Sequence, residues 1–204
     1  MRTPSRKAAS GLLVLIVSAV SFAACKGPAP ARGNRVLLVG NSIFAASRDT
    51  LTAALQADGW DPVVNAFPGT TIEFWSTDIQ KGIAKEKPDI VVLELGTNDC
   101  GTVPCTQLGP YIDELMRKLT SVDAVLWLTV QHDALIPHDP AYVNFEIESA
   151  AARWPNLFLV DMGSLFDGHP EWRKDGTHPT AEGQLRMATL IVDALRPFKP
   201  KPRS

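Results

Sequence analysis

Five short apolar runs recur along the chain between Arg35 and Asp161. They read RVLLV (35–39), PVVNA (62–66), DIVVLEL (89–95), AVLWLTV (124–130) and LFLVD (157–161). Short runs that are rich in branched side chains are typical of buried strands in a parallel sheet. We therefore predict five strands over these residues.

Polar and apolar positions between these runs repeat with the period of an α-helix. The pattern predicts helices over 48–58, 71–86, 109–120, 140–153 and 180–196. Thr180 is the candidate N-cap of the last helix, because its hydroxyl can accept a hydrogen bond from a free backbone N–H. Strands that alternate strictly with helices predict an α/β fold in which a five-stranded parallel sheet is covered on both faces, with right-handed crossovers.

Polar residues and glycines follow the predicted strands at the places where such a sheet binds ligands. In open parallel sheets, ligands lie beyond the carboxyl ends of the strands. The first strand is followed by GNS with Ser42, the second by NAFPGTT with Gly69 and the third by ELGTNDCG with Asn98. The segment RKDGTHPTAEGQ, which contains Asp175 and His178, precedes the last helix. We expect these residues to meet at one edge of the sheet.

These residues form the set that acyl transfer requires. A serine hydroxyl becomes a strong nucleophile when a neutral imidazole removes its proton, and a carboxylate fixes the tautomer of that imidazole. Asp175 and His178 are three residues apart, so a tight turn can bring the carboxylate to one ring nitrogen and aim the other at Ser42. The backbone N–H groups of Ser42 and Gly69 and the side-chain amide of Asn98 are candidate donors to the oxyanion.

Ser42 also has a second interpretation, as the N-cap of a helix that starts after the first strand. Serine is one of the preferred residues at that position. The two roles are compatible, because a helix N-terminus also favours negative charge.

The four polar segments resemble the sequence blocks of the SGNH hydrolases, also called the GDSL-type esterase family. GNS, the glycine of NAFPGTT, GTND and DGTH match these blocks in order, and the resemblance extends over about residues 35–195. The chain departs from the family at Asn41, where an aspartate is usual. This side chain is not one of the catalytic groups, and an amide keeps much of the local hydrogen-bonding capacity.

The resemblance implies a three-layer, flavodoxin-like α/β/α sandwich and a serine esterase that needs no cofactor and no metal. It implies that Ser42, Asp175 and His178 are catalytic, and that Ser42, Gly69 and Asn98 form the oxyanion hole. The segment VDMGSLFDGHPEWRKDGTHPTAEG is also similar to extracellular SGNH domains attached to membrane acyltransferases that act on cell-envelope glycans. The expected substrate is therefore a small ester or an acylated glycan.

Three functions remain open from the sequence. The first is hydrolysis of a carboxylic ester, which we favour because the chain contains no visible acyl-donor partner. The second is a glycan O-acyltransferase, which would share the acyl-serine intermediate and differ only in the acceptor of the acyl group. The third is an inactive SGNH-like binding module.

The first 24 residues are expected to be a signal peptide rather than part of the domain. MRTPSRK carries three positive charges, and an apolar run that ends in small residues follows it. The end of this run, SFAAC, resembles the lipobox of bacterial lipoproteins, which implies that Cys25 is lipidated and anchors a cell-envelope lipoprotein to a membrane. Cleavage as a plain secreted protein and retention as a transmembrane anchor are the alternatives.

The remaining residues divide into a Pro/Gly tether over 25–33, one hydrolase domain over 34–197 and a tail over 198–204. The whole chain of 204 residues is 45% hydrophobic and 21% charged, which is ordinary globular composition. Without the signal peptide, the chain has 17 basic and 22 acidic residues. No basic stripe is present, so we expect no nucleic-acid partner. We expect a monomer.

Several further residues have candidate roles. Cys100 and Cys105 are expected to form a disulfide, with two free thiols as the alternative. QHDALIPHDP (131–140) has a composition that could bind a metal, although its spacing matches no known ligand pattern. Asp99 is expected to orient its loop. Residues 72–75 and 135–142 are expected to set the depth of the pocket, and Trp172 either walls this pocket or serves in packing.

Overall fold

The fold contains the five predicted strands. A computed structural model of the chain describes residues 28–100, 105–136 and 138–200. Each strand begins within one residue of its predicted start, and the bounds are β1 (Arg35–Gly40), β2 (Asp61–Ala66), β3 (Ile90–Glu94), β4 (Ala124–Leu128) and β5 (Leu157–Val160).

All neighbouring strands pair in parallel, in the order β2-β1-β3-β4-β5. The chain passes from β1 to β2 on one side and then returns to place β3 on the other side of β1. Strands β1 and β3 are therefore neighbours, and ligands bind where the strand order reverses in this way. The observed order is that of a flavodoxin-like α/β fold, which confirms the predicted fold class.

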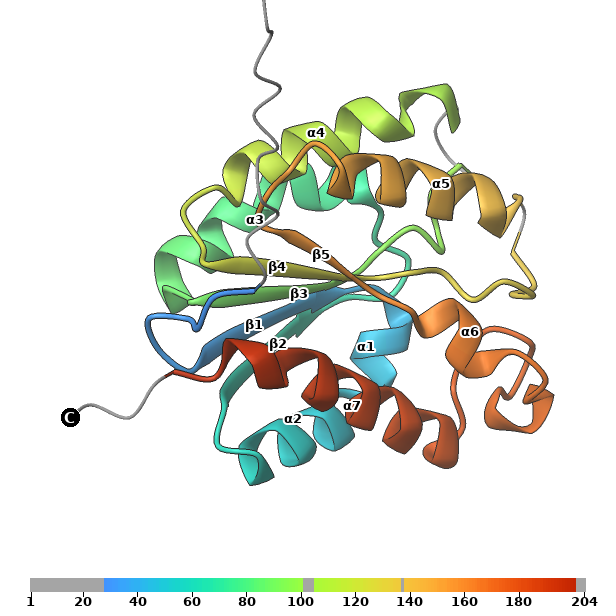
Figure 1. The fold of residues 1–204 in the computed structure, drawn as a ribbon. Helices are drawn as coiled ribbons and strands as arrows, with labels where there is room; N and C mark the ends of the chain where they lie inside the picture. The colour runs from blue at the N-terminus through green and yellow to red at the C-terminus, as the bar shows by residue number, and fades with distance from the viewer. Residues whose placement is uncertain (1–27, 101–104, 137, 201–204) are drawn as a thin grey trace, which may run out of the picture.

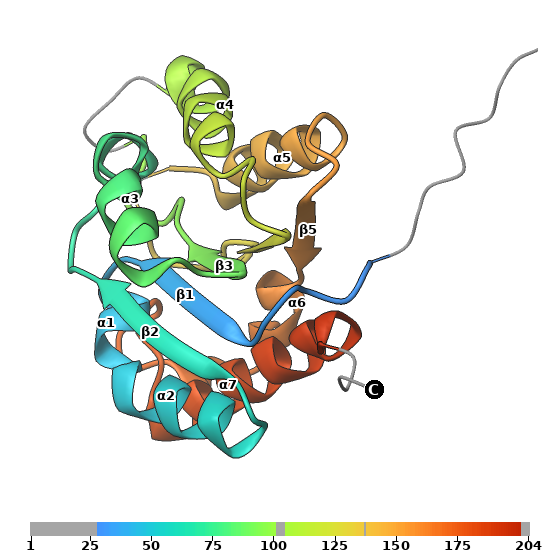
Figure 2. The same ribbon diagram turned by 90° about the vertical axis from the view of Figure 1, so that its left-hand side faces the viewer.

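The helices form a layer on each face of the sheet (Figures 1 and 2). One layer consists of α3 (Ile72–Glu86), α4 (Leu108–Lys118) and α5 (Pro140–Ala151). The opposite layer consists of α1 (Ser42–Ala46), α2 (Arg48–Ala57), α6 (Met162–Phe166) and α7 (Ala181–Leu195). Short 3-10 turns cover Cys105–Gln107, Pro170–Trp172 and Arg196–Phe198.

Alternate side chains of each strand enter opposite cores. Leu38, Val92 and Leu126 pack against the layer that contains α2 and α7. Their neighbours Leu37, Val91 and Val125 pack against α3, α4 and α5. The strands are thus apolar on both faces, which explains why their sequences are continuous hydrophobic runs.

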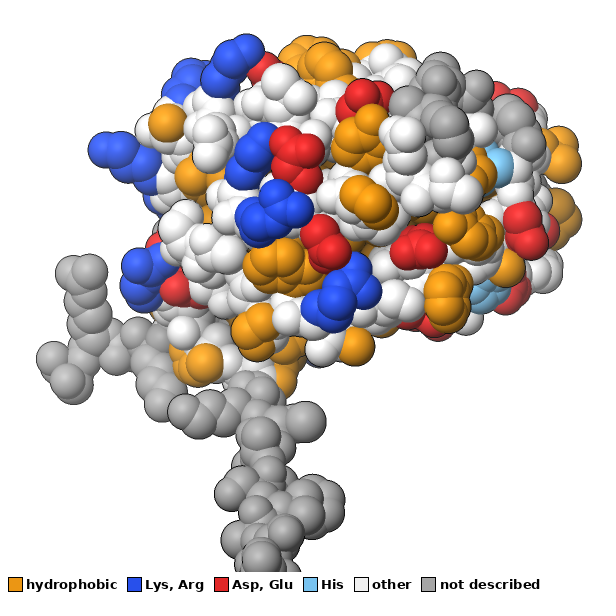
Figure 3. Space-filling model, turned by 90° about the horizontal axis from the view of Figure 1, so that it is seen from above, with side chains coloured by type: hydrophobic (Ala, Val, Ile, Leu, Met, Phe, Trp, Pro, Cys, Tyr) orange, Lys and Arg blue, Asp and Glu red, His pale blue; other side chains and the backbone are white. Residues whose placement is uncertain are grey.

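The surface over α3–α5 has an uneven distribution of charge. Most of the Lys and Arg side chains visible on this face lie to the left in Figure 3, which is the end where the strands of Figure 1 begin. Among the described residues, no helix combines the length and the apolar character needed to cross a bilayer.

The ends of the described chain pack against the domain. Ala31, in the segment expected to be a tether, is only 5% exposed, and its N–H donates to the carbonyl of Phe198 at 2.9 Å. Phe198, the first residue of the expected tail, is 3% exposed and contacts the Phe158 ring. The domain therefore makes contacts with residues on both sides of 34–197. The expected signal peptide and the expected lipidation site Cys25 lie outside the described residues.

Candidate active site

Ser42 is the first residue of α1, directly after the carboxyl end of β1. The N-cap of this helix is Asn41, whose Oδ1 accepts a hydrogen bond from the N–H of Ile43 at 2.9 Å. The cap interpretation of Ser42 is therefore wrong, because the preceding amide already fills that position. The Ser42 hydroxyl is thus free of a capping bond and lies beside the ring of His178.

Asp175 and His178 lie in a tight turn before α7. One carboxylate oxygen of Asp175, Oδ1, accepts from the N–H of His178 at 2.8 Å and from the N–H of Thr177 at 3.1 Å. The other oxygen, Oδ2, is 2.9 Å from His178 Nδ1. Gly176 between them has a φ of +80°, a conformation that glycine adopts without strain. The DGTH sequence thus folds into the predicted acid–imidazole pair.

The other ring nitrogen of His178 reaches Ser42. His178 Nε2 lies 2.8 Å from Ser42 Oγ, so the three side chains form a continuous hydrogen-bonded row. A carboxylate beside Nδ1 favours the tautomer with its proton on that nitrogen, which leaves Nε2 as an acceptor. Hydrogen bonds from the backbone N–H and the ring of His178 lower the pKa of Asp175 to about 2. Asp175 is therefore ionised at neutral pH.

The two other residues expected in the oxyanion hole differ in their position. Asn98 lines the same pocket as Ser42, and one N–H of its side chain donates to the carbonyl of Thr70 at 3.0 Å. This bond fixes the amide plane and leaves the second N–H for a ligand. Gly69 precedes Thr70 and has a φ of +77°, but it is not among the residues that line the pocket.

The pocket around Ser42 is open and has a volume of about 430 Å³. Polar groups form one part of its wall, whereas Leu135 and Ile136 supply apolar surface. Its lining residues are Ser42, Thr97, Asn98, Leu135, Ile136, Asp175, Thr177 and His178. Thr97 and Thr177 were not predicted from the sequence, although each adjoins a predicted site residue, Asn98 or His178.

The aromatic residues expected near the pocket serve in packing. Trp75 is fully buried, and its indole N–H donates to Thr70 Oγ1 at 3.1 Å, so this residue does not line the pocket. The ring of Trp172 stacks on His169 with centroids 3.8 Å apart, and the guanidinium of Arg186 lies 5.2 Å from the ring centroid. Of the two segments expected to set the depth, only the second contributes to the lining, through Leu135 and Ile136.

The side chains of the candidate metal-binding segment have separate partners. His132 Nδ1 is 3.0 Å from a carboxylate oxygen of Asp167, and His138 Nε2 is 3.2 Å from the carbonyl of Gly96. Asp133 forms a two-point ion pair with Arg173. These side chains do not converge on one point, so the metal interpretation has no geometric support.

Two further expectations concern the loop after Asn98. Cys100 and Cys105 form a disulfide whose Cα atoms are 4.6 Å apart. Asp99 is buried, and its Oδ1 accepts from the N–H of Ile72 at 3.0 Å, so this carboxyl joins the loop to the start of α3. Burial raises the pKa of Asp99 to about 6. Both contacts restrain the chain next to Asn98.

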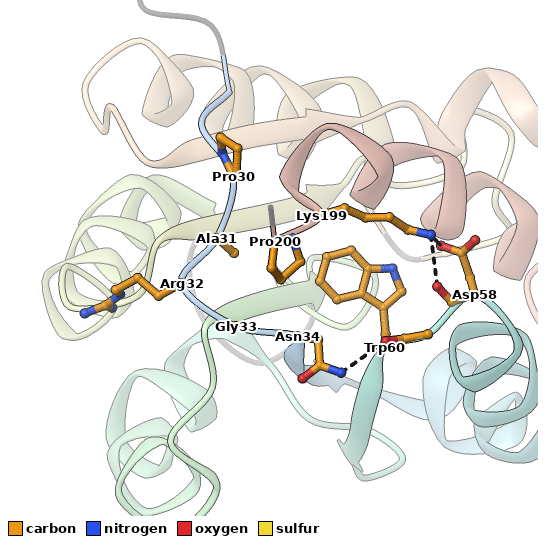
Figure 4. A pocket seen from close by; sticks show the side chains of 10 residues that line it. Pro30, Ala31, Arg32, Gly33, Asn34, Asp58, Trp60, Lys199 and Pro200 are labelled. Atoms are coloured by element: carbon orange, nitrogen blue, oxygen red, sulfur yellow. Dashed lines mark hydrogen bonds and ion pairs between the residues drawn. The ribbon is translucent and has the colours of Figure 1, made fainter. Parts of the chain in front are cut away.

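A larger hollow lies at the opposite end of the sheet (Figure 4). It lies beside Asn34 and Trp60, which directly precede β1 and β2. Two of its charged side chains, Asp58 and Lys199, pair with each other at 2.9 Å, and the third, Arg32, pairs with Asp123. Because ligands of parallel sheets bind at the carboxyl ends of the strands, the hollow beside Ser42 is the candidate active site.

Solved structures of similar fold include acyl hydrolases and the catalytic domain of an acetyltransferase. A lipase/acylhydrolase from Enterococcus faecalis matches with a TM-score of 0.71 and 21% identity over 83% of this chain and 100% of that one. The acetyl xylan esterase AlAXEase matches with a TM-score of 0.69 and 17% identity over 79% and 99% of the two chains. The C-terminal catalytic domain of peptidoglycan O-acetyltransferase A from Streptococcus pneumoniae matches with a TM-score of 0.65 and 20% identity over 86% and 100%.

The sequence itself places the chain in a family. No protein with curated function matches it. The family model of the GDSL-like lipase/acylhydrolases matches residues 38–186, which include every residue of the hydrogen-bonded row. The chain is therefore a hydrolase that belongs to the GDSL-like lipase/acylhydrolase family.

Proposed function

We propose that the protein hydrolyses short-chain carboxylic esters through an acyl-serine intermediate at Ser42. The observation that carries this proposal is the row in which Ser42 Oγ is 2.8 Å from His178 Nε2 and His178 Nδ1 is 2.9 Å from Asp175 Oδ2. These distances are within the range over which a proton is transferred directly.

In the first half of the reaction, Ser42 Oγ attacks the carbonyl carbon of the ester while its proton passes to His178 Nε2. Asp175 remains ionised and stabilises the imidazolium that results. The free N–H of the Asn98 amide and the backbone N–H of Ser42 donate to the oxyanion of the tetrahedral intermediate. His178 then gives its proton to the alcohol oxygen, the ester C–O bond breaks, and the acyl group stays on Ser42.

In the second half, water replaces the alcohol. His178 removes a proton from the water as its oxygen attacks the acyl carbon, and then returns this proton to Ser42 Oγ as the bond to serine breaks. The products are a carboxylic acid and the free enzyme. An alcohol in place of water would give acyl transfer by the same steps.

The proposed substrate is an acetyl or similarly short ester on a glycan of the cell envelope. An open pocket of about 430 Å³ admits a bulky alcohol partner. Two structures of similar fold carry names that refer to acetyl groups on polysaccharides, an acetyl xylan esterase and a peptidoglycan O-acetyltransferase. Export through residues 1–24 and lipidation of Cys25 would place the enzyme at that location.

Hydrolysis of a chromogenic acetate ester tests the proposed activity. Ser42→Ala should lower kcat/KM by at least about a thousandfold, since this is the scale of the loss when a triad member is removed. Ser149→Ala, on α5 and remote from the pocket, is the matched control and should keep the wild-type rate. Equal turnover by wild type and Ser42→Ala would refute the proposal.

The acceptor of the acyl group is measured separately. Enzyme is supplied with an ester that carries a labelled acetyl group, together with an acceptor oligosaccharide. We expect most of the label as free acetate. Faster transfer of label to the oligosaccharide than to water would identify an acyltransferase instead.

A further inference from the structure

Glu94 is a buried carboxyl group that the steps above do not use. It is the last residue of β3, and the register of the sheet places it beside Gly40 at the end of β1. Its side chain is 1% exposed. It therefore lies at the switch point of the sheet, between the segments that carry Ser42 and Asn98.

A single oxygen of this carboxyl group receives bonds from both segments. Glu94 Oε1 accepts from the side-chain amide of Asn41 at 3.3 Å and from the hydroxyl of Thr97 at 3.3 Å. Asn41 directly precedes the nucleophile Ser42, and Thr97 directly precedes Asn98.

We propose that Glu94 is a positioning residue that joins the nucleophile turn to the oxyanion loop and thereby fixes the distance between Ser42 and Asn98. This inference rests on the proposed function of that site. It assigns Asn41 and Thr97 the role of linking their catalytic neighbours to one shared acceptor.

The protonation state of Glu94 suits this role. Burial raises its pKa to about 8, and its hydrogen bonds with Asn41 and Thr97 only partly oppose that effect. The carboxyl group is thus mainly neutral at pH 7. A neutral acceptor can hold both segments without placing a full negative charge beside the oxyanion that forms in the reaction.

The amide at position 41 is matched to this acceptor. Its Oδ1 accepts from the N–H of Ile43, and its Nδ2 donates to Glu94. An ionised aspartate could make the first bond but not the second, because it has no proton to donate. Asn41 therefore caps α1 and connects it to β3 at the same time.

Two substitutions at position 97 test the proposal with little change of volume. Thr97→Val removes the hydroxyl donor and should lower kcat about tenfold with KM nearly unchanged, because small displacements of catalytic groups have effects of this size. Thr97→Ser keeps the donor and should stay within about threefold of wild type. Equal effects of the two substitutions on kcat would overturn the proposal.

A double-mutant cycle then tests whether Thr97 acts through Glu94. Glu94→Ala should lower kcat about a hundredfold, and Glu94→Gln, a neutral group of similar shape, should recover at least a tenth of the wild-type rate. In the Glu94→Ala background, Thr97→Val should cause no further loss. Independent, multiplicative losses from the two substitutions would overturn the assignment.

The control carboxyl for these measurements is Glu114 on α4, a partly exposed group that pairs with Lys118. Glu114→Gln should retain wild-type kcat and KM. Circular dichroism establishes that each variant is folded. If Glu94→Ala does not fold, the comparison of Thr97→Val with Thr97→Ser still tests the proposal. A wild-type protein that cleaves no ester would refute the proposed function, whereas an active wild type with insensitive variants would refute only this inference.

Discussion

At the scale of single residues, two carboxyl groups beside the candidate active site, Asp175 and Glu94, have opposite protonation states. Asp175 is held ionised because backbone and ring N–H groups lower its pKa to about 2. Glu94 is held neutral because burial raises its pKa to about 8. Pairs of carboxyl groups whose surroundings separate their pKa values are typical of active sites in which each group has a different task.

Removing the negative charge of Asp175 should lower kcat strongly even when the size of the side chain is kept. Asp175→Asn keeps a side chain of the same size but supplies no negative charge to the imidazolium and favours the wrong tautomer of His178. We expect kcat to fall about 10³- to 10⁴-fold. Steady-state kinetics with the chromogenic acetate ester measure this, and Asp167→Asn, at the exposed partner of His132, is the control. A loss below tenfold would contradict the assignment of Asp175.

Glu94 should give the protein a stability that decreases as the pH rises. Its pKa is higher in the folded state than the ordinary value of 4.5, so the folded state binds the proton more tightly. The stabilisation that results is complete below the ordinary pKa of 4.5. It is lost as the pH rises through the pKa of the folded state, which is about 8. Compared with Glu94→Gln, the wild type should lose up to about 1.4 kcal/mol of unfolding free energy per pH unit between pH 5 and 8. Urea unfolding at several pH values measures this difference, and parallel curves for the two proteins would contradict it.

The proposed catalytic residues could be predicted from the sequence, but Glu94 could not. Ser42, Asp175 and His178 lie in the motifs GNS and DGTH, and their residue types and spacing predict the roles proposed for them. Glu94 lies inside the apolar run DIVVLEL, where the sequence gives no sign that its carboxyl group is buried. Its role depends on the neighbouring strand, which only the assembled sheet reveals.

At the scale of elements, the loop after β4 supports the loop that carries Asp175 and His178. The guanidinium of Arg173 is almost fully buried and forms a two-point pair with Asp133, with one contact at 2.7 Å. The N–H of Leu135 donates to the carbonyl of Gly176 at 3.2 Å, and the hydroxyl of Thr177 donates to the carbonyl of Leu135 at 3.2 Å. These bonds hold the turn that presents His178.

Arg173→Lys should weaken this support while keeping the charge. A lysine cannot reproduce the planar two-point contact. Because Asp133 is half exposed, we expect a loss of only about 1 kcal/mol in unfolding free energy. We expect kcat/KM to fall about tenfold through misplacement of His178. Arg153→Lys, on the surface pair with Asp113, is the matched control and should leave kcat/KM unchanged. Equal kinetics of the two variants would contradict a supporting role.

Helices and strands were predicted correctly where the segment is long enough to show a repeat of apolar positions. The strands and the longer helices lie close to their predicted bounds, but α6 was missed, and the helix start considered at Ser42 had no predicted extent. Helices α1 and α6 each have only five residues, which is too short to show a helical repeat. The run AVLWLTV also extended the predicted strand too far, because the N–H of Val130 leaves the sheet and donates to Asn144 Oδ1 at 2.7 Å.

At the scale of the whole molecule, the strand order creates the site. The sequence order places β2 between the segments of Ser42 and Asn98, yet in the sheet β1 and β3 are neighbours. Alternation of strands and helices predicts a parallel sheet but does not specify this order. The flavodoxin-like order followed from the family resemblance, and the structure confirms it.

The two helical layers should unfold together, because they share one sheet. Leu55 on α2 and Ile79 on α3 are fully buried in opposite cores. Leu55→Ala and Ile79→Ala should each lower the unfolding free energy by about 2–5 kcal/mol. Each should shift one and the same urea unfolding transition. Tryptophan fluorescence and circular dichroism during urea unfolding measure this. Separate transitions for the two signals would contradict a single cooperative unit.

The central claim, that Ser42 is an activated nucleophile, is tested most directly by covalent labelling. The full chain is treated with a serine-directed fluorophosphonate, and the modified residue is located by peptide mass spectrometry. We predict a single adduct on Ser42 that forms much more slowly in His178→Ala. A folded protein that takes up no label, or takes it up at another residue, would contradict this account of the active site.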